Sequence, residues 1–483
     1  MAPGLLKFFS AAAGFLALAA CSSVAYSPRP LKVEESAAEF LGRSGDTSAL
    51  KAFAIANGYR AQDWPPAQWG LAELTLVGLY FHPDLSAARL RAEVARAELA
   101  GAAQPQSWGA QVRPGYHSRE LPDTSGPWTL GLELEFPLVA QRKRAALAER
   151  SAFLADAAEL DIAQAAWLVR SRLRDSFLEL WASREALALA NAQVAARRQM
   201  LGMASRRAQA GMLSARELAI EQLAVLQLEQ TLGQQAVRGQ RARGELAAAL
   251  GLPLDVLERM SLRFDPRVSA AIDLDDAALR RLALRNRLDV HRRLLEFGAA
   301  DAEVKLAVAM QNPDFRLGPG YAWDQGDNVW SLALGINFPG AARAQASIRE
   351  AQARRELAAE QFTATQALVI GLTSSAGAHY RLAGERVENA QRSLQLQQEQ
   401  ESRIIRQFDS GAADRMQRTA AHIETLGAQS VLVAALVDWR QSLAQLEDAV
   451  QRPLLDDFER VADTKVQRSA AIANGTSAVL RKP

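Results

Sequence analysis

Cysteine is almost missing from this sequence of 483 residues, which contains it once, at position 21. A single thiol excludes a disulfide within the chain and leaves Cys21 free for acylation. Long apolar segments are missing as well, since no run of about 18 consecutive apolar residues, the length that marks a transmembrane helix, follows the N-terminal region. Any membrane crossing by the mature chain must therefore be made by strands.

Neither sign of charge predominates, because 56 Lys and Arg residues are interspersed with 54 Asp and Glu residues. The sequence thus has no electrostatic footprint for nucleic acid. Patterns for enzymatic chemistry are also missing: there is no G-x-S-x-G, H-E-x-x-H or P-loop, and the five histidines are not spaced as metal ligands. We therefore predict a protein that is not an enzyme, with no cofactor and no metal site.

Proline, which breaks helices, is missing from residues 138–252 and 340–452. The chain has only 6% aromatic residues and is rich in Ala, Leu, Gln, Arg and Glu, which favours long helices. Both segments are predicted to be helical hairpins in antiparallel coiled-coil packing, turning near Gly211 and Gly411. A helix over 141–209 would be ~100 Å long, and shorter helices over 71–103 and 213–250 would together match it.

The N-terminus has the features of a bacterial lipoprotein signal. Lys7 supplies a positive charge, Phe8 to Ala20 form a short apolar run, and Leu18-Ala19-Ala20-Cys21 is a small-residue cleavage box. We expect cleavage before Cys21 and lipidation of that residue, the alternative being an ordinary secretory signal with an incidental cysteine. Ser22, in place of the Asp that favours inner-membrane retention, favours the outer membrane.

The sequence contains an internal duplication. The run Trp128 to Leu138 aligns without a gap with the run Trp330 to Gly340. Upstream of each run lies a Pro-Gly-Tyr sequence, at 114–116 and at 319–321. Each copy therefore supplies one hairpin, with strands at about 108–118 and 127–137 in the first and about 314–323 and 329–338 in the second.

Side chains alternate between apolar and polar along these strands, whose length suits tilted membrane-crossing strands of about 9–11 residues. We expect Leu130, Leu132, Leu334 and Ile336 to face lipid. We expect the charged residues Arg113, Glu133, Glu135 and Arg316 to face a lumen. The alternative is a soluble amphipathic hairpin packed on helices. Prolines 114 and 319 donate no ladder hydrogen bond, so bulges are expected there.

The order and duplication of these features resemble the TolC-like outer-membrane factor family over residues 70–452. The matching sequences are His82-Pro83-Asp84-Leu85 and Asn286-Arg-Leu-Asp289, then Phe136-Pro137-Leu138, Ala210-Gly-Met-Leu-Ser214 and Leu250-Gly251. The implied divisions are a signal peptide over 1–20, a periplasmic surface segment over 21–70, a first repeat over 71–252, a linker over 253–275, a second repeat over 276–452 and a polar tail over 453–483.

The resemblance implies a mostly helical fold with membrane strands. Three copies would close a 12-stranded β-barrel in the outer membrane above an α-barrel of long helices; four strands from one chain could not close a barrel. It also implies a passive exit duct of a tripartite efflux system for drugs or metal cations, with a periplasmic adaptor and an RND-type inner-membrane transporter as partners. The alternatives are an exit channel for type I protein secretion and a structural periplasmic coiled-coil lipoprotein.

Two candidate sites lie at the helical turns. The resemblance makes Gly211, Met212, Leu213 and Ser214 the tip that docks the adaptor, the alternative being a tight helix connection. Asp409 and Asp414 flank the second turn, and three copies would bring six carboxylates together as a periplasmic gate with a raised pKa. The alternative is that both are solvated turn residues, with Asp414 capping the next helix.

Overall fold

The computed structural model describes residues 26–118, 126–138, 140–264 and 275–454. The chain divides into two compact units, Met1–Arg43 and Ser44–Pro483, and each is described by itself. The predicted signal peptide, Cys21 and most of the predicted C-terminal tail lie outside the described residues. In the first unit, α2 (Val33–Leu41) has Glu34 and Glu35 in its first turn, where negative charge interacts favourably with the helix dipole.

The second unit opens with a short helix, a turn and a small aromatic cluster. Helix α3 (Ser48–Ala56) is capped by the Thr47 hydroxyl, which accepts from the Leu50 amide, and the 3-10 turn η2 (Ala61–Asp63) follows. The rings of Trp64 and Trp69 meet edge to face at 5.4 Å between centroids. Both indoles are buried in the core of the first repeat, so this part of residues 21–70 is a structural element of that core.

Short helices precede the strands in both repeats. They are α4 (Leu71–Phe81) and α5 (Pro83–Ala103) in the first repeat, and α9 (Asp276–Asn286) and α10 (Leu288–Ala309) in the second. The single helix predicted over 71–103 is wrong, because it is broken at His82. That residue is extended, with ψ 125°, since a residue before proline is disfavoured in the helical region, and Pro83 starts the next helix.

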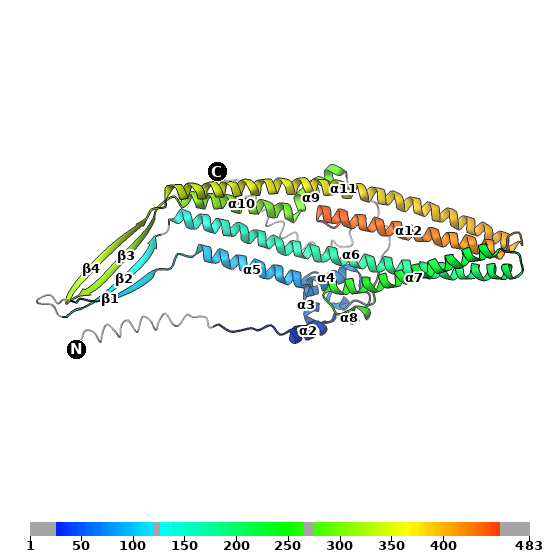
Figure 1. The fold of residues 1–483 in the computed structure, drawn as a ribbon, viewed down its shortest axis with the longest axis horizontal. Coiled ribbons are helices and arrows are strands. Elements are labelled where there is room, and N and C mark those ends of the chain that lie inside the picture. The colour runs from blue at the N-terminus through cyan, green and yellow to red at the C-terminus, as the bar shows by residue number, and fades with distance from the viewer. Residues whose placement is uncertain (1–25, 119–125, 139, 265–274, 455–483) are drawn as a thin grey trace. The chain divides into compact units, whose positions relative to one another are not determined.

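The long helices are the main feature of the unit (Figure 1). Helices α6 (Gln141–Gln209) and α11 (Ala341–Asp409) have 69 residues each, as predicted for the first of them. Helices α7 (Ala215–Leu250) and α12 (Arg415–Val450) have 36 each and return antiparallel, with the short α8 (Leu254–Glu258) after α7. Helix α6 packs against α5 and α7, while α11 packs against α9, α10 and α12. Helix α6 also packs against α10 and α12, so the two repeats are in contact along it.

Four antiparallel strands form one sheet in the order β1-β2-β3-β4. They are β1 (Gly109–Tyr116), β2 (Trp128–Leu138), β3 (Asp314–Asp324) and β4 (Asp327–Asn337), close to the predicted positions. Strands β3 and β4 are joined by Gln325 and Gly326, both with positive φ, as a tight hairpin turn with the right strand twist requires.

The bulges predicted at the prolines are wrong. Pro114 pairs in register with Leu130 on the edge strand β1, where a missing amide hydrogen costs little. The β2–β3 ladder keeps one register on both sides of Pro319 but is interrupted between the Glu133–Gly320 and Phe136–Leu317 pairs. A local gap thus accommodates the proline without shifting any side chain to the other face.

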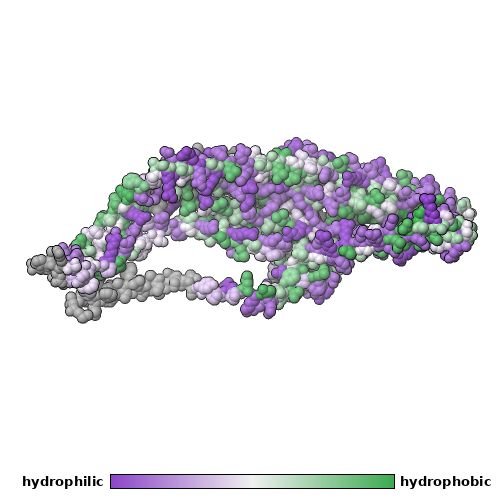
Figure 2. All heavy atoms as spheres, in the orientation of Figure 1, coloured by the Kyte–Doolittle hydropathy of each residue, from purple (hydrophilic) through white to green (hydrophobic). Residues whose placement is uncertain are grey.

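One described helix, α12, contains a window apolar enough to cross a membrane, with mean hydropathy 1.4. Its partner α11 is antiparallel to it and carries charged residues such as Glu385, Arg386 and Arg392. A bilayer crossing by α12 would take these charges into hydrocarbon, which is costly. We therefore attribute the apolar surface of α12 to packing between helices; in Figure 2 hydrophobic patches interrupt a mostly hydrophilic helical surface.

Candidate functional site

The sheet has one charged and one apolar face. Neighbouring partners in the ladder place Arg113, Glu133, Glu135 and Arg316 on the same face. Arg113 Nη2 lies 2.9 Å from Glu133 Oε2, and Arg316 Nη1 lies 2.7 Å from Glu135 Oε1. The four residues predicted to share a face are therefore brought together as two ion pairs, whose charges cancel.

The opposite face is apolar and exposed to a degree that is unusual for a soluble sheet. Leu130 pairs with Trp323 and Leu132 with Tyr321, while Leu334 pairs with Leu317. Aromatic pairs lie at both ends: Tyr116–Trp128 and Tyr321–Trp330 near the turns, and Trp108–Phe136 near the helices. An exposed apolar band between two aromatic girdles suits a membrane-spanning strand surface. In the sheet, β1 and β4 each have one partner strand, so both edges of the sheet are open.

Lys143 connects the helices to the sheet. Its buried ammonium donates to the Asn312 carbonyl oxygen at 2.9 Å and lies 2.7 Å from Asp314 Oδ1, at the start of β3. This contact could not be predicted from the sequence, because Lys143 lies in a basic run, Arg142-Lys143-Arg144, and nothing local identifies a partner in the other repeat.

The first helical tip is a compact turn closed by backbone hydrogen bonds. Gly211 has φ +72°, which glycine adopts without strain, and the Met212 amide donates to the Arg207 carbonyl oxygen at 2.8 Å. Ser214 caps α7, and its amide donates to Glu217 Oε2 in a capping box. Leu213 is half-buried and Met212 is exposed, so the tip presents both as an apolar surface.

At the second tip, Gly411 has φ +80°, and Asp414 caps α12 by accepting from the Gln417 amide at 2.8 Å. The second oxygen of Asp414 lies 2.6 Å from Arg207 Nη2, so an ion pair joins the two tips. The Gln417 amide and Arg207 lower the pKa of Asp414 within one chain, opposite to the rise expected from a ring of carboxylates. Its contribution to stability is present above the ordinary value of 3.8 and is lost as the pH falls through the lowered value.

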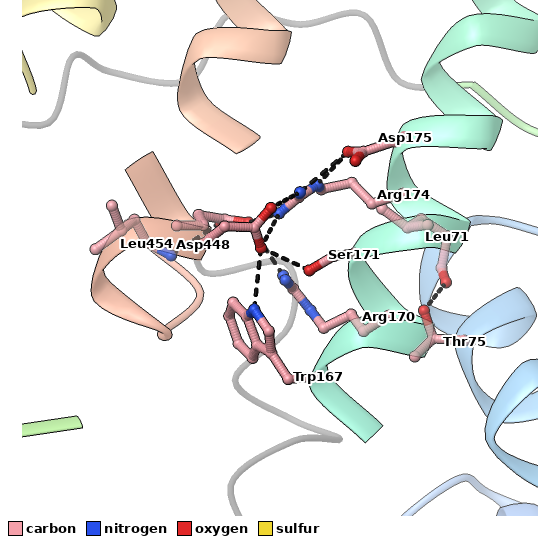
Figure 3. A network of polar contacts seen from close by, with 10 residues as sticks. Leu71, Thr75, Trp167, Arg170, Ser171, Arg174, Asp175, Asp448 and Leu454 are labelled. Carbon is pink, nitrogen blue, oxygen red and sulfur yellow. Dashed lines mark hydrogen bonds and ion pairs between the residues drawn. The ribbon is translucent and has the colours of Figure 1, made fainter. Parts of the chain in front are cut away.

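A buried polar network joins the two repeats where α6 meets the end of α12 (Figure 3). Arg174 Nη2 lies 2.6 Å from Asp448 Oδ2, and Glu447 Oε2 lies 3.2 Å from Arg174 and 3.3 Å from Arg170. The Trp167 indole and the Ser171 hydroxyl also donate to Asp448. No local sequence pattern predicts this network.

Burial is the largest influence on the pKa values of the two arginines in this network. It lowers the pKa of Arg170, although Glu447 acts in the other direction. Burial also acts to lower the pKa of Arg174, but the hydrogen bond and charge of Asp448 outweigh it, so that this pKa is raised. Both guanidinium groups stay charged, and the carboxylates of Glu447 and Asp448 compensate the cost of burying these charges.

Within the described ranges, no group of three or more His, Cys, Asp or Glu side chains lies close enough to hold a metal ion. Asp324 and Asp327 face each other across the β3–β4 turn, and the Asn328 side chain accepts from the Tyr321 hydroxyl at 2.6 Å. Asp324, Asp327 and Asn328 therefore take part in the pairing and side-chain hydrogen bonding of the β3–β4 hairpin.

No protein-family model matches the sequence, and no curated protein matches it. Solved structures do match. The outer membrane protein VceC of Vibrio cholerae has a TM-score of 0.65 at 17% identity, covering 80% of this chain and 97% of VceC. The outer-membrane channel OprN has a TM-score of 0.65 at 19% identity, covering 89% and 99%. The chain has the fold of these outer-membrane channels.

A third similar structure is the open state of the MtrE outer membrane channel of Neisseria gonorrhoeae, with a TM-score of 0.63 at 15% identity over 80% of this chain and 90% of MtrE. The predicted fold class, long paired helices with four antiparallel strands, is thereby confirmed, as is the resemblance to TolC-like proteins at the level of the fold. In this channel fold, the two-faced sheet and the helical tips lie at opposite ends of the long helices (Figure 1).

Proposed function

We propose that the chain is a passive exit duct of a bacterial outer membrane, in which three copies close a 12-stranded β-barrel over a helical tunnel. The observation that carries this proposal is the sheet, whose apolar face, charged face and two open edges suit one third of a closed barrel. The fold shared with outer-membrane channels supports it. The duct performs no chemistry and needs no cofactor.

The internal duplication supports assembly with further copies. Helix α6 of the first repeat packs on α12 of the second, for example where Gln193 donates to Ser430 at 3.0 Å. Helical residues 200 positions apart correspond in the two repeats, as Gly211 and Gly411 do, so α11 and α7 are the counterparts of α6 and α12. The corresponding faces of α11 and α7 are exposed. Leu226 of α7 is 60% exposed, whereas its counterpart Leu426 is 5% exposed. Leu382 of α11 is 52% exposed, whereas its counterpart Ala182 is 2% exposed. A second copy that repeats the α6–α12 contact would cover these apolar residues.

The proposal is tested by recording purified full-length protein in planar lipid bilayers. We expect stable conducting trimers from the wild type. Leu226→Arg should reduce trimers and conductance together, because three buried guanidiniums would lie in an apolar contact. Gln227→Arg, an exposed neighbour on a different side of α7, is the matched control and should assemble normally. A conducting monomer, or equal behaviour of the two variants, would contradict the proposal.

The first tip is the part of the proposed duct that docks a periplasmic adaptor. Its exposed Met212 and half-buried Leu213 form an apolar knob that a partner helix can cover. Leu213→Asp should weaken adaptor cross-linking by about tenfold or more while trimers persist, because a buried apolar anchor is lost. Ala413→Asp, at the counterpart position of the second tip, should keep cross-linking. Full pump activity in Leu213→Asp would count against docking at this turn.

The second tip is the proposed periplasmic gate, where the carboxylates of Asp409 and Asp414 from three copies would attract cations. Asp409→Ala combined with Asp414→Ala should lower cation selectivity and weaken block by multivalent cations. Arg207→Ala should act in the opposite direction, because Arg207 neutralises Asp414 in the wild type. Single-channel recordings measure both effects. Unchanged selectivity in the double variant would place control of the entrance elsewhere.

The remaining parts of the proposal concern location and cargo. Lipidation of Cys21 in the outer membrane predicts that labelled palmitate enters the wild type but not Cys21→Ser. We also propose that the duct exports drugs or metal cations, together with an adaptor and an RND-type transporter of the inner membrane. Deletion of the gene should then make cells more sensitive to drugs or to metal cations. Loss of a secreted protein instead would support type I secretion.

A further inference from the structure

A groove of about 360 Å³ lies between α6 and α7, away from the tips and the sheet. Its lining includes the apolar residues Leu180, Leu187 and Val237, together with Gly239 and the two basic residues Arg184 and Arg243. The volume is within the range of about 300–1,000 Å³ that small-molecule sites occupy.

The second repeat shows what fits into such a groove. The residue that corresponds to Gly239 is Trp439, which is buried. Its ring centroid lies 5.9 Å from that of Tyr380, the counterpart of Leu180. A Cβ atom built on Gly384, the counterpart of Arg184, would lie 3.9 Å from atoms of the Trp439 indole. An indole therefore occupies, in the second hairpin, the space that Gly239 leaves open in the first.

The charges beside the groove differ from those of the second repeat. Arg184 and Arg243 stand where the second repeat has Gly384 and Leu443. In the part of the chain that the structure describes, no carboxylate lies within ion-pair distance of either guanidinium. Desolvation and the charge of Arg243 lower the pKa of Arg184, and the group stays charged. Two like charges without an acidic partner favour an anion, which both can bind.

We propose that this groove binds a planar aromatic carboxylate of about the size of an indole. The ring occupies the space above Gly239 between the leucine side chains, and the carboxylate lies toward Arg184 and Arg243. The proposal is independent of the role of the chain as a duct, because the groove lies on one helical hairpin and needs no conduction.

The test titrates full-length protein in detergent with indole-3-acetate and, separately, with uncharged indole, by calorimetry. We expect saturable binding of indole-3-acetate and affinity for indole about three- to tenfold weaker, since exposed ion pairs contribute modestly. Gly239→Trp should abolish binding by filling the groove with the side chain of its counterpart. Gln227→Trp, at an exposed position on a different side of the same helix, should bind as the wild type does.

Arg184→Gln combined with Arg243→Gln keeps the test decisive if the tryptophan variant does not fold. This variant should bind the two ligands equally, because the preference for the carboxylate is lost. Absence of saturable binding to the wild type overturns the proposal. A groove that is already filled by a second copy of the chain would give this result. Unchanged binding in folded Gly239→Trp, or an unchanged preference in the arginine variant, also overturns it.

Discussion

Glu447→Gln should lower the free energy of unfolding by about 3 kcal/mol or more, the range expected when one partner of a buried ion pair loses its charge. Glu447 is 5% exposed and lies within 3.3 Å of both Arg170 and Arg174, and it also accepts from the Leu454 amide. Without the carboxylate charge, Arg170 and Arg174 lose the acidic group that both contact, while Arg174 keeps its pairs with Asp448 and Asp175, and the desolvation cost of both guanidiniums remains. Denaturant unfolding in detergent measures the difference between variants.

The matched control is Asp438→Asn on the same helix. Asp438 lies 2.7 Å from Arg386, but both side chains are substantially exposed, so this pair should contribute about 1 kcal/mol or less. Replacing Arg170, Arg174 and Glu447 together by Met, Met and Leu should recover much of the stability, because an apolar group of similar size avoids the desolvation cost. Equal losses for Glu447→Gln and Asp438→Asn would show that the network is not a principal contact between the repeats.

The strands and long helices could be predicted because their signals are local. Alternation of Leu132 and Glu133 defines the two faces of β2, whichever strands β2 pairs with. The proline-free segments bound the two helical hairpins, and Gly211 and Gly411 mark where each hairpin turns. The break at His82 was also encoded locally, in the proline that follows it, because a residue before proline is disfavoured in the helical region.

The partners of buried charges could not be predicted, because they lie far apart in the sequence. Arg170 and Glu447 are separated by 277 positions, and neither has a local pattern that distinguishes it from exposed Arg and Glu residues on the same helices. The tip-to-tip contact of Arg207 with Asp414 is similar: the cap at Asp414 follows from its place before a helix, but its ion pair depends on how two hairpins pack.

Leu132→Arg should prevent assembly of the barrel, whereas Glu133→Arg should not. Leu132 lies near the middle of β2 between Val112 and Tyr321, on the apolar face that the proposed barrel presents to lipid. An arginine at this depth costs about 2–4 kcal/mol in each chain, and a trimer contains the substitution three times. Heat-resistant trimers on gels, and their yield in outer-membrane fractions, measure the effect.

Glu133 is the matched control, since it is adjacent in sequence and points to the other face. Glu133→Arg removes the 2.9 Å pair with Arg113 and adds like charge, but a water-filled lumen screens that repulsion, so trimers should form with altered conductance. Because the wild-type face carries Arg113 and Arg316 against Glu133 and Glu135, this variant should shift selectivity toward anions. Equal assembly of the two variants would contradict the assignment of the apolar face to lipid and of the charged face to the lumen.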